Sequence, residues 1–337
     1  MGRDLAIDLG TANTLVYRQG EGIVFDQPTV IALNTRSGDV LAMGDEAWEM
    51  IGRTPGHVVA MRPLRHGAIT DFDITEHMIR LILKRVGVSR FPRPRVLICV
   101  PSAITEVERR AVKEAARGAG GRDVALVEEP LAAAIGAGLP VHEPIGNLIV
   151  DIGGGTSEMA VVSMGGIVTG KAIRVGGFDM DAAIQHHVRK VYGIAVGERT
   201  AEEMKMAIGS AYPTPGLPGA KIRGRDLATG MPKEVDVSEE EVREALSESV
   251  QRIVEATRDT LATSPPELAH DVLETGVFLT GGGVLLRGLD MRLAHGCEVP
   301  VQLAEHPLTT VVAGVGRLLD YEPDQREAFL TAHRPVP

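Results

Sequence analysis

One pattern occurs twice in this chain. Its two copies contain Asp8 and Asp151, which are separated by 143 positions in the sequence. Leu5–Tyr17 and Leu148–Val161 each contain a short apolar strand ending at an aspartate, a turn rich in Gly and Thr, and a second apolar strand. Turns of this composition present backbone N–H groups and hydroxyls, which suit a phosphate. An aspartate beside such a turn can hold a hydrated Mg²⁺, because that ion needs few protein carboxylates. The duplication therefore predicts two similar halves that close on one polyphosphate.

Composition sets the broad class of protein. The 337 residues exceed a comfortable single core, so we expect two domains. No run of about 18 uninterrupted apolar residues occurs, which excludes a spanning helix. Because the first predicted strand follows Met1 closely, we expect no signal peptide, and two distant cysteines, Cys99 and Cys297, lead us to expect reduced thiols in a cytoplasmic setting. A net charge of −10 argues against nucleic acid as a partner.

The order of predicted elements supports a duplicated α/β protein. Strands and helices alternate from residue 5 and restart at Asn147 in the same order. Capping-box patterns at Asp73–Glu76 and Thr105–Glu108 predict helix starts, and a longer helix is expected to run from Val237 to about Ala262. The predicted strands are 5–8, 14–17, 23–25, 29–33, 95–100, 124–127, 148–151, 158–162, 167–173 and 276–280.

A third glycine turn, Gly281–Gly283, follows the last of these strands and leads into an expected helix. Without side chains, this turn would let a flat base or a ribose lie on the backbone, with a helix N-terminus near a phosphate. Glycines in a turn also serve close packing or positive φ alone, and both interpretations stay open for this turn taken by itself. None of the three turns continues into the Gly-Lys-Ser/Thr of a Walker loop.

The three turns, in this order and spacing, resemble the actin-type ATPase superfamily, which includes actin, sugar kinases and heat-shock chaperone ATPases. Within it the chain is similar to bacterial actins of the MreB/Mbl family, from residue 4 to about 320. The resemblance rests on Asp8–Tyr17, Glu128–Pro140, Asp151–Thr156, Gly197–Glu202, Ile208–Ala211 and Leu279–Gly283. It implies a duplicated actin-like ATPase fold with two lobes, each a mixed sheet flanked by helices, and two smaller subdomains.

The resemblance also implies domain boundaries. Lobe I would span residues 1–143 and lobe II residues 144–315, followed by a tail at 333–337. In lobe I, the inner subdomain would comprise about residues 1–31, 70–143 and 316–332, and the outer subdomain about residues 32–69. In lobe II, the inner subdomain would comprise about residues 144–180 and 243–315, and the outer subdomain about residues 181–242.

For the site, the resemblance implies bound ATP or ADP with Mg²⁺. Asp8 and Asp151 would hold Mg²⁺ through water, and Glu129 would orient the attacking water, with Asp151 and Thr156 completing the catalytic set. The nucleotide would contact Asp8, Gly10, Thr11, Ala12, Asn13, Gly153, Gly154, Gly155, Thr156, Glu202, Lys205, Gly281, Gly282 and Gly283.

Two of these assignments have alternatives. Taken without the resemblance, Glu129 is better explained as an acidic residue favoured in the first turn of a helix, with Pro130 behind it. Glu202 and Lys205, three residues apart on one helix face, would lie near the adenosine or form a surface ion pair.

In the family that the chain resembles, ATP sets a closure of the lobes that favours head-to-tail assembly, and slow hydrolysis times it. A head-to-tail contact that does not close on itself makes a filament. The expected partners are further copies of this chain, the inner membrane surface and membrane proteins of the cell-elongation machinery. A sugar or small-metabolite kinase on the same scaffold is the alternative, and it would need a catalytic base and a polar substrate pocket. A chaperone ATPase would carry a separate peptide-binding domain.

The chain departs from the family at several places. Its first residues do not show the pattern of the amphipathic N-terminal helix of many relatives, so we expect any membrane contact at the 89–95 loop, which places Phe91 between Arg90 and Arg93. That arrangement suits an anionic bilayer, although Phe91 packed beneath its own loop is equally consistent. Phe178 and His306 stand where relatives usually carry Asp, and we expect changes in lobe closure or subunit contacts there. The sequence does not separate MreB from Mbl.

Overall fold

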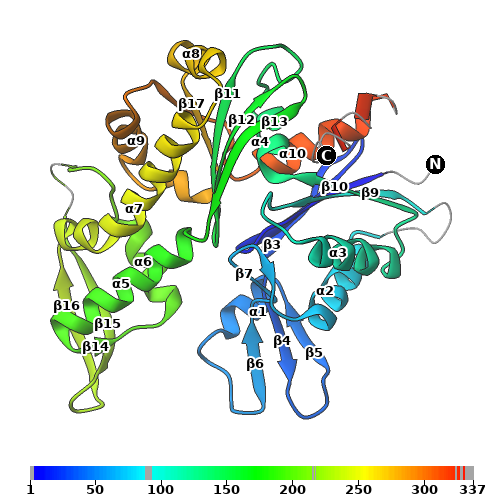
Figure 1. The fold of residues 1–337 in the computed structure, drawn as a ribbon. Coiled ribbons are helices and arrows are strands. Elements are labelled where there is room, and N and C mark those ends of the chain that lie inside the picture. Colours follow the sequence, from blue (N-terminus) through cyan, green and yellow to red (C-terminus); the bar gives the residue numbers. More distant parts are fainter. Residues whose placement is uncertain are drawn as a thin grey trace.

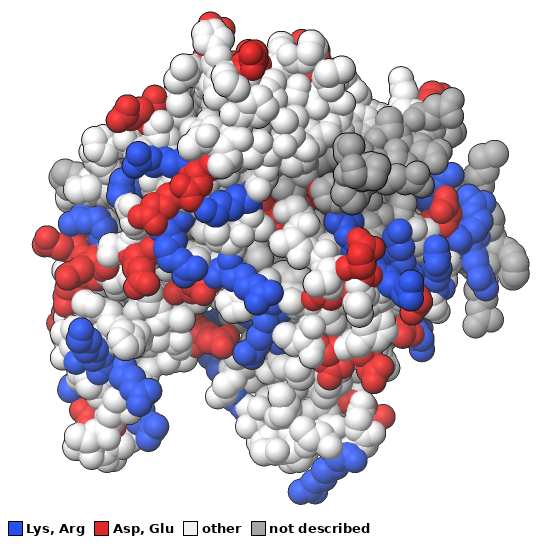
Figure 2. All heavy atoms as spheres, viewed as in Figure 1, with Lys and Arg blue, Asp and Glu red and all other residues white. Residues whose placement is uncertain are grey.

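Two lobes form the molecule. The computed structural model describes residues 4–87, 93–214, 216, 218–322, 325–326 and 329–330. The lobes meet at one end, around helices α4 and α10, and diverge towards the other (Figure 1). The space-filling view shows a notch between the diverging ends (Figure 2).

A five-stranded sheet forms the centre of lobe I. Its order is β10-β9-β1-β2-β3, in which β1 pairs antiparallel with β2 and parallel with β9. The strands are β1 (Leu5–Leu9), β2 (Asn13–Arg18), β3 (Gly22–Pro28), β9 (Arg95–Val100) and β10 (Asp123–Glu128).

Lobe II repeats this arrangement. Its sheet has the order β13-β12-β11-β17-β18, and β11 pairs antiparallel with β12 and parallel with β17. The strands are β11 (Asn147–Ile152), β12 (Ser157–Ser163), β13 (Gly166–Ile173), β17 (Val277–Thr280) and β18 (Val301–Leu303). Strand for strand, the two sheets have the same order and the same pairing directions. The predicted internal duplication is therefore confirmed.

Smaller sheets extend each lobe. In lobe I they comprise β4 (Ile31–Asn34), β5 (Val40–Met43) and β6 (Val58–Met61), then the hairpin β7 (Leu64–Arg65) and β8 (Ala68–Ile69). In lobe II they comprise β14 (Ile194–Ala195), β15 (Ala220–Asp226) and β16 (Pro232–Val237). These additions form the diverging ends in Figure 1 and fit the two predicted outer subdomains, whose boundaries stay a prediction.

Helices flank the sheets. They are α1 (Asp45–Met50), α2 (Phe72–Arg85), α3 (Glu106–Gly118), α4 (Glu129–Gly136), α5 (Gly177–Tyr192), α6 (Glu198–Ile208), α7 (Glu239–Ala262), α8 (Pro266–Thr275), the 3₁₀ turn η1 (Gly282–Leu285), α9 (Leu289–Cys297) and α10 (Thr310–Asp320). The capping box at Thr105 and Glu108 is confirmed, and α7 ends at the predicted Ala262. The capping box predicted at Asp73 is wrong, because Asp71 caps α2 and accepts from the Ile74 N–H.

A shared core joins the lobes. Side chains of α4 and α10 pack together with Ala6 and Leu97 from the first sheet and Ile149 and Ala160 from the second. Since this core belongs to both sheets, it fixes the lobes at one end and leaves the opposite ends to be held by other contacts. None of the helices within the described ranges is both long and apolar enough to cross a membrane.

Candidate nucleotide site

Asp8 and Asp151 occupy equivalent positions in the two sheets. Asp8 lies beside Cys99 on the parallel strand β9, and Asp151 lies beside Thr280 on the parallel strand β17. Burial raises the pKa of each aspartate to about 7, with Asp26 adding to the effect at Asp8 and Asp8 itself adding at Asp151. The Asp8 carboxylate of lobe I therefore acts on the Asp151 carboxylate of lobe II.

Two glutamates complete a carboxylate cluster, defined here as Asp8, Glu129, Asp151 and Glu158. Burial, and then Glu158, raise the pKa of Glu129 well above its usual value. Burial also raises the pKa of Glu158 to about 7, although its carboxylate accepts from the Ser102 N–H at 3.1 and 3.2 Å. Buried carboxylates that lie near one another disfavour each other's ionised forms. A cation bound among them would reverse that effect.

Glu158 was not among the predicted site residues. It lies directly opposite Asp151 in the β11–β12 hairpin, so the strand register was the sequence signal that would have found it.

The donor set fits a hydrated Mg²⁺. Within the described residues, no group of three or more His, Cys, Asp or Glu side chains is arranged to enclose a metal ion. Asp8 and Asp151 instead offer two carboxylates from opposite lobes. Mg²⁺ keeps several of its waters and binds through one or two carboxylates plus substrate phosphates, so this sparse set suits it.

The first two glycine turns face each other. A Cβ at Gly154 would lie 2.7 Å from Cβ of Ala12, and one at Gly155 would lie 3.0 Å from Cγ2 of Thr11. Within its own turn, Gly10 has no room for a side chain, because a Cβ would lie 2.5 Å from the Asn13 carbonyl oxygen. The structure thus brings together two segments that the sequence paired only by pattern.

Hydrogen bonds fix the shape of these turns. The Gly153 N–H donates to the Thr156 carbonyl at 2.9 Å, and the Thr29 hydroxyl donates to the Gly10 carbonyl at 2.6 Å. The exposed side chain of Asn13 donates to Asp26 at 3.2 Å, so it lies towards β3.

The third turn packs against the second lobe's aspartate. Gly281 has φ +85°, and a Cβ there would collide with Asp151 Oδ1. A Cβ at Gly283 would collide with Ile152, whereas Gly282 is exposed with only Leu308 nearby. Close packing therefore accounts for Gly281 and Gly283, and Gly282 is the one free to lie against a ligand. The expected helix after this turn is only the 3₁₀ turn η1.

The predicted adenosine contacts lie on α6. Lys205 donates to the Gly177 carbonyl at 3.0 Å and forms an ion pair with Asp181 at 2.8 Å. Burial raises the pKa of Asp181 to about 6, and Lys205 acts against that rise. Lys205 thus pairs with Asp181 on α5 rather than with Glu202, and Glu202 lies half-buried on the wall of the cavity between the lobes.

A hairpin that the sequence analysis missed lies between the glycine turns. His66 Nδ1 and the Gly155 carbonyl oxygen are 3.2 Å apart, and the Gly67 N–H donates to the Thr11 hydroxyl at 3.3 Å. His66 adopts left-handed φ (+47°) at the tip of the β7–β8 hairpin. Because the contacts of this hairpin with Gly155 and Thr11 join residues far apart in sequence, no local sequence pattern predicts them.

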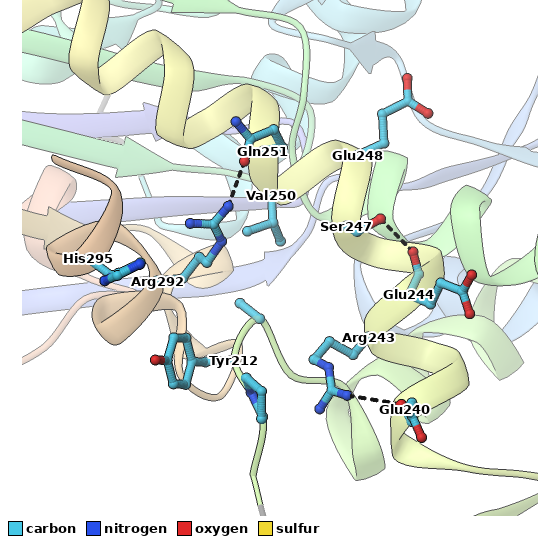
Figure 3. Close-up of a pocket in the computed structure, with 12 residues that line it drawn as sticks. Tyr212, Glu240, Arg243, Glu244, Ser247, Glu248, Val250, Gln251, Arg292 and His295 are labelled. Atoms are coloured by element: carbon cyan, nitrogen blue, oxygen red, sulfur yellow. Dashed lines mark hydrogen bonds and ion pairs between the residues drawn. The ribbon is translucent and has the colours of Figure 1, made fainter.

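Two cavities differ in chemical character. One, of about 380 Å³, opens between the diverging ends and takes its walls from both lobes, including Trp48, Arg62, Phe178 and Glu202. The other, of about 840 Å³, lies between α7, α9 and the segment after α6 (Figure 3), and none of the predicted site residues lines it. There Arg292 donates to Gln251 at 2.6 Å. Neither the carboxylate cluster nor any of the glycine turns lines the second cavity, whose walls carry Glu240, Glu244 and Glu248 beside Arg243 and Arg292.

The comparisons with known proteins agree with this geometry. A family model described as MreB/Mbl protein matches residues 2–327. The chain belongs to the MreB/Mbl family. It is 48% identical over 319 residues to the cell shape-determining protein Mbl of Bacillus subtilis, covering 94% of this chain and 96% of that one. It is 50% identical over 323 residues to MreB of Escherichia coli, covering 94% and 93%.

A solved structure of an MreB/Mbl protein has the same fold. MreB5 of Spiroplasma citri bound to ADP matches with a TM-score of 0.91 and 35% identity over 97% of this chain and 98% of that one. The same protein bound to AMPPNP matches with a TM-score of 0.88 over 94% and 96%. The actin-like fold and the assignment as a bacterial actin are confirmed, and the kinase alternative is not favoured.

The departures from the MreB/Mbl pattern have different outcomes. Phe91 and Arg90 lie outside the described residues, and Arg93 is exposed. His306 is exposed, and its carbonyl accepts from the Thr310 hydroxyl at 2.8 Å in the first turn of α10. Phe178 lies on the cavity between the lobes.

Proposed function

We propose that this bacterial actin binds ATP with Mg²⁺ between its lobes, hydrolyses it slowly, and forms membrane-associated filaments that organise cell-wall synthesis and cell shape. The observation that carries the proposal is the pair of facing glycine turns beside the carboxylate cluster. The ADP-bound and AMPPNP-bound structures of MreB5 support nucleotide binding by this chain.

Each predicted residue has a role in this proposal. Gly10, Thr11, Ala12, Asn13 and the Gly153–Thr156 turn would hold the β- and γ-phosphates, while Glu202, Lys205 and Gly281–Gly283 would lie at the nucleoside. Asp8 and Asp151 would hold Mg²⁺ through water, and the ion would neutralise charge on the phosphates.

Glu129 would act on the attacking water. Phosphoryl transfer needs positioning and charge stabilisation more than a covalent group. Burial and the neighbouring carboxylates raise the pKa of Glu129, and a raised pKa makes a carboxylate a stronger base once it is ionised. The position of Glu129 at the start of α4 also puts it on the core that both lobes share.

Filament formation and membrane attachment belong to the same proposal. The relatives are named for determining cell shape, and a head-to-tail polymer would multiply a weak membrane contact per subunit. Arg90, Phe91 and Arg93 would form that contact at the inner face of the cell membrane. Lys and Arg side chains also gather over the α3 region of lobe I (Figure 2), where Arg110 and Arg117 are exposed. Membrane proteins of the elongation machinery are the expected partners.

Sedimentation tests this function. Purified protein should pellet with Mg-ATP and show filaments by electron microscopy, and anionic liposomes should increase the pelleted fraction. Phe91→Ser should reduce liposome recruitment but retain nucleotide binding. A protein that stays monomeric with ATP in both conditions, and instead phosphorylates a sugar, would contradict the proposal.

A further inference from the structure

The aromatic ring of Phe178 is fixed to the second phosphate turn. In the first turn of α5, the Phe178 N–H donates to the Gly154 carbonyl at 2.8 Å, and the Gly177 N–H donates to the Gly153 carbonyl at 3.0 Å. A Cβ at Gly154 would lie 3.2 Å from two ring atoms of Phe178. A movement of this turn would therefore move the ring directly.

Arg62, from the opposite lobe, lies on that ring. Its Cζ is 4.2 Å from the centroid of Phe178 and 4.8 Å from the ring of Trp48 on α1. A guanidinium stacked on aromatic faces gains both electrostatic and packing energy, and the gain increases as water is excluded. Arg62 is half-buried here, and the carboxylates of Glu198 and Glu202 on α6 act on it favourably.

These contacts join the diverging ends of the two lobes. The shared core lies at the other end of the molecule, around α4 and α10, so it does not by itself hold the outer parts together. Arg62 and Trp48 belong to the smaller sheet region of lobe I, whereas Phe178 begins α5 of lobe II. The stack therefore lies on the cavity that opens between the diverging ends of the lobes.

We propose that Trp48, Arg62 and Phe178 form a clasp that holds the lobes closed and couples closure to the Gly153–Gly155 phosphate turn. This inference rests on the proposed function, because a nucleotide must occupy that turn for the coupling to operate. A shift of the turn when the γ-phosphate is lost would displace Phe178 through its backbone hydrogen bonds. The stack on Arg62 would then weaken, and the cleft would open for product release.

The clasp also gives a role to Phe178, at a position where the family resemblance leads us to expect aspartate. Aspartate at this position would offer Arg62 an ion pair, which salt screens, whereas the ring offers a stack that depends less on ionic strength. Closure in this chain should accordingly be less sensitive to salt than closure in a Phe178→Asp variant.

Release of a fluorescent ATP analogue from the full chain tests the clasp. Arg62→Gln and Phe178→Leu should each speed dissociation by roughly five- to tenfold, the range expected for a partly desolvated cation–π contact. The double variant should release the analogue little faster than either single variant, because each single substitution already removes the same Arg62–Phe178 stack. Hydrolysis of ATP already bound, measured in a single turnover, should change less than dissociation does.

Matched variants separate the clasp from a general loss of structure. Phe178→Tyr keeps the ring and should dissociate like the wild type, Phe178→Asp should dissociate faster as salt is raised, and Arg53→Gln removes an exposed arginine of the same region without effect. Wild-type rates for Arg62→Gln, independent effects that multiply in the double variant, or equal rates for Phe178→Tyr and Phe178→Leu would overturn the clasp while leaving nucleotide binding intact. Absence of binding by the wild-type protein would refute the proposed function as well.

Discussion

At the scale of single residues, the carboxylate cluster lowers the stability of the ligand-free protein and suits the binding of a cation. Asp8, Glu129, Asp151 and Glu158 all have raised pKa values, because burial and mutual repulsion penalise their ionised forms. An arrangement of this kind is costly in a ligand-free protein and is typical of a site that receives positive charge.

Replacing Glu129 by Gln should separate hydrolysis from binding. The amide keeps the size of the side chain but cannot take a proton from water, so we expect phosphate release to slow by about 100-fold or more. Nucleotide affinity should stay within a few-fold of wild type, because Glu129 is not a predicted phosphate or metal contact. Phosphate-release kinetics and nucleotide titration check the two expectations, and undiminished hydrolysis would remove Glu129 from the proposed mechanism.

Stability of the ligand-free protein should fall as pH rises. Asp151 has a pKa of about 7 when folded against 3.8 for the free side chain, so the folded chain binds more protons than the unfolded chain between these values. The free energy of unfolding then decreases with rising pH across that window. Thermal unfolding should show Asp151→Asn to be more stable than wild type at pH 8 and nearly equal to it at pH 4. If the stability of the wild-type protein instead increased from pH 5 to pH 7, and Asp151→Asn removed that increase, the raised pKa of Asp151 would be contradicted.

The predicted site residues came from patterns that are local in sequence. Of the residues that were missed, Glu158 lies opposite Asp151 in the same hairpin, whereas Arg62 and His66 are far in sequence from the residues that they contact. Asp8 and Asp151 could be found because each ends an apolar strand beside a turn. Arg62 and His66 reach the site only because a hairpin of one lobe folds against the turn of the other. No spacing within the chain encodes that approach.

At the scale of elements, the glycine turns determine how closely the strands and helices around the site approach. Gly281 combines positive φ with contact to Asp151, whereas Gly230 has a similar φ of +75° and nothing within 4 Å of its missing Cβ. The two positions differ chiefly in crowding, and this makes them a matched pair.

Gly281→Ala should damage the site more than Gly230→Ala does. Both variants carry the cost of a left-handed alanine, about 1–2 kcal/mol. Only Gly281→Ala must also displace the carboxylate of Asp151, so it should lower the melting temperature further and abolish tight nucleotide binding. Melting curves and nucleotide titration of both variants test this, and equal behaviour would mean that crowding at the third turn is unimportant.

The strands on either side of the first two glycine turns were predicted well, whereas the β7–β8 hairpin beside these turns and several helices were missed. The strands β1, β2, β11 and β12 have strong apolar patterns on both sides of a glycine turn, and they occur close to the expected positions. The sequence analysis did not identify α1, α8, α9 or α10. Short amphipathic segments with weak starts, such as α9 after Gly288, are stabilised by packing against the rest of the lobe rather than by local propensity.

At the scale of the whole molecule, the duplication would let one bound ligand control the relative position of the two lobes. Each sheet contributes one aspartate and one glycine turn, and the α4 and α10 core joins the sheets at one end. A bound triphosphate would contact both lobes at once, and closure would change the surfaces available for assembly.

Calorimetric titration of Mg-ATP tests the central claim, that aspartates from both lobes hold one magnesium-bound triphosphate. The wild-type chain should bind one nucleotide per subunit, and affinity should fall by at least about tenfold in both Asp8→Ala and Asp151→Ala, roughly 1.4 kcal/mol or more of lost binding energy. Omitting Mg²⁺ should weaken wild-type binding far more than it weakens binding by either variant. Wild-type affinity in either aspartate variant, or no nucleotide binding by the unaltered chain, would contradict the account.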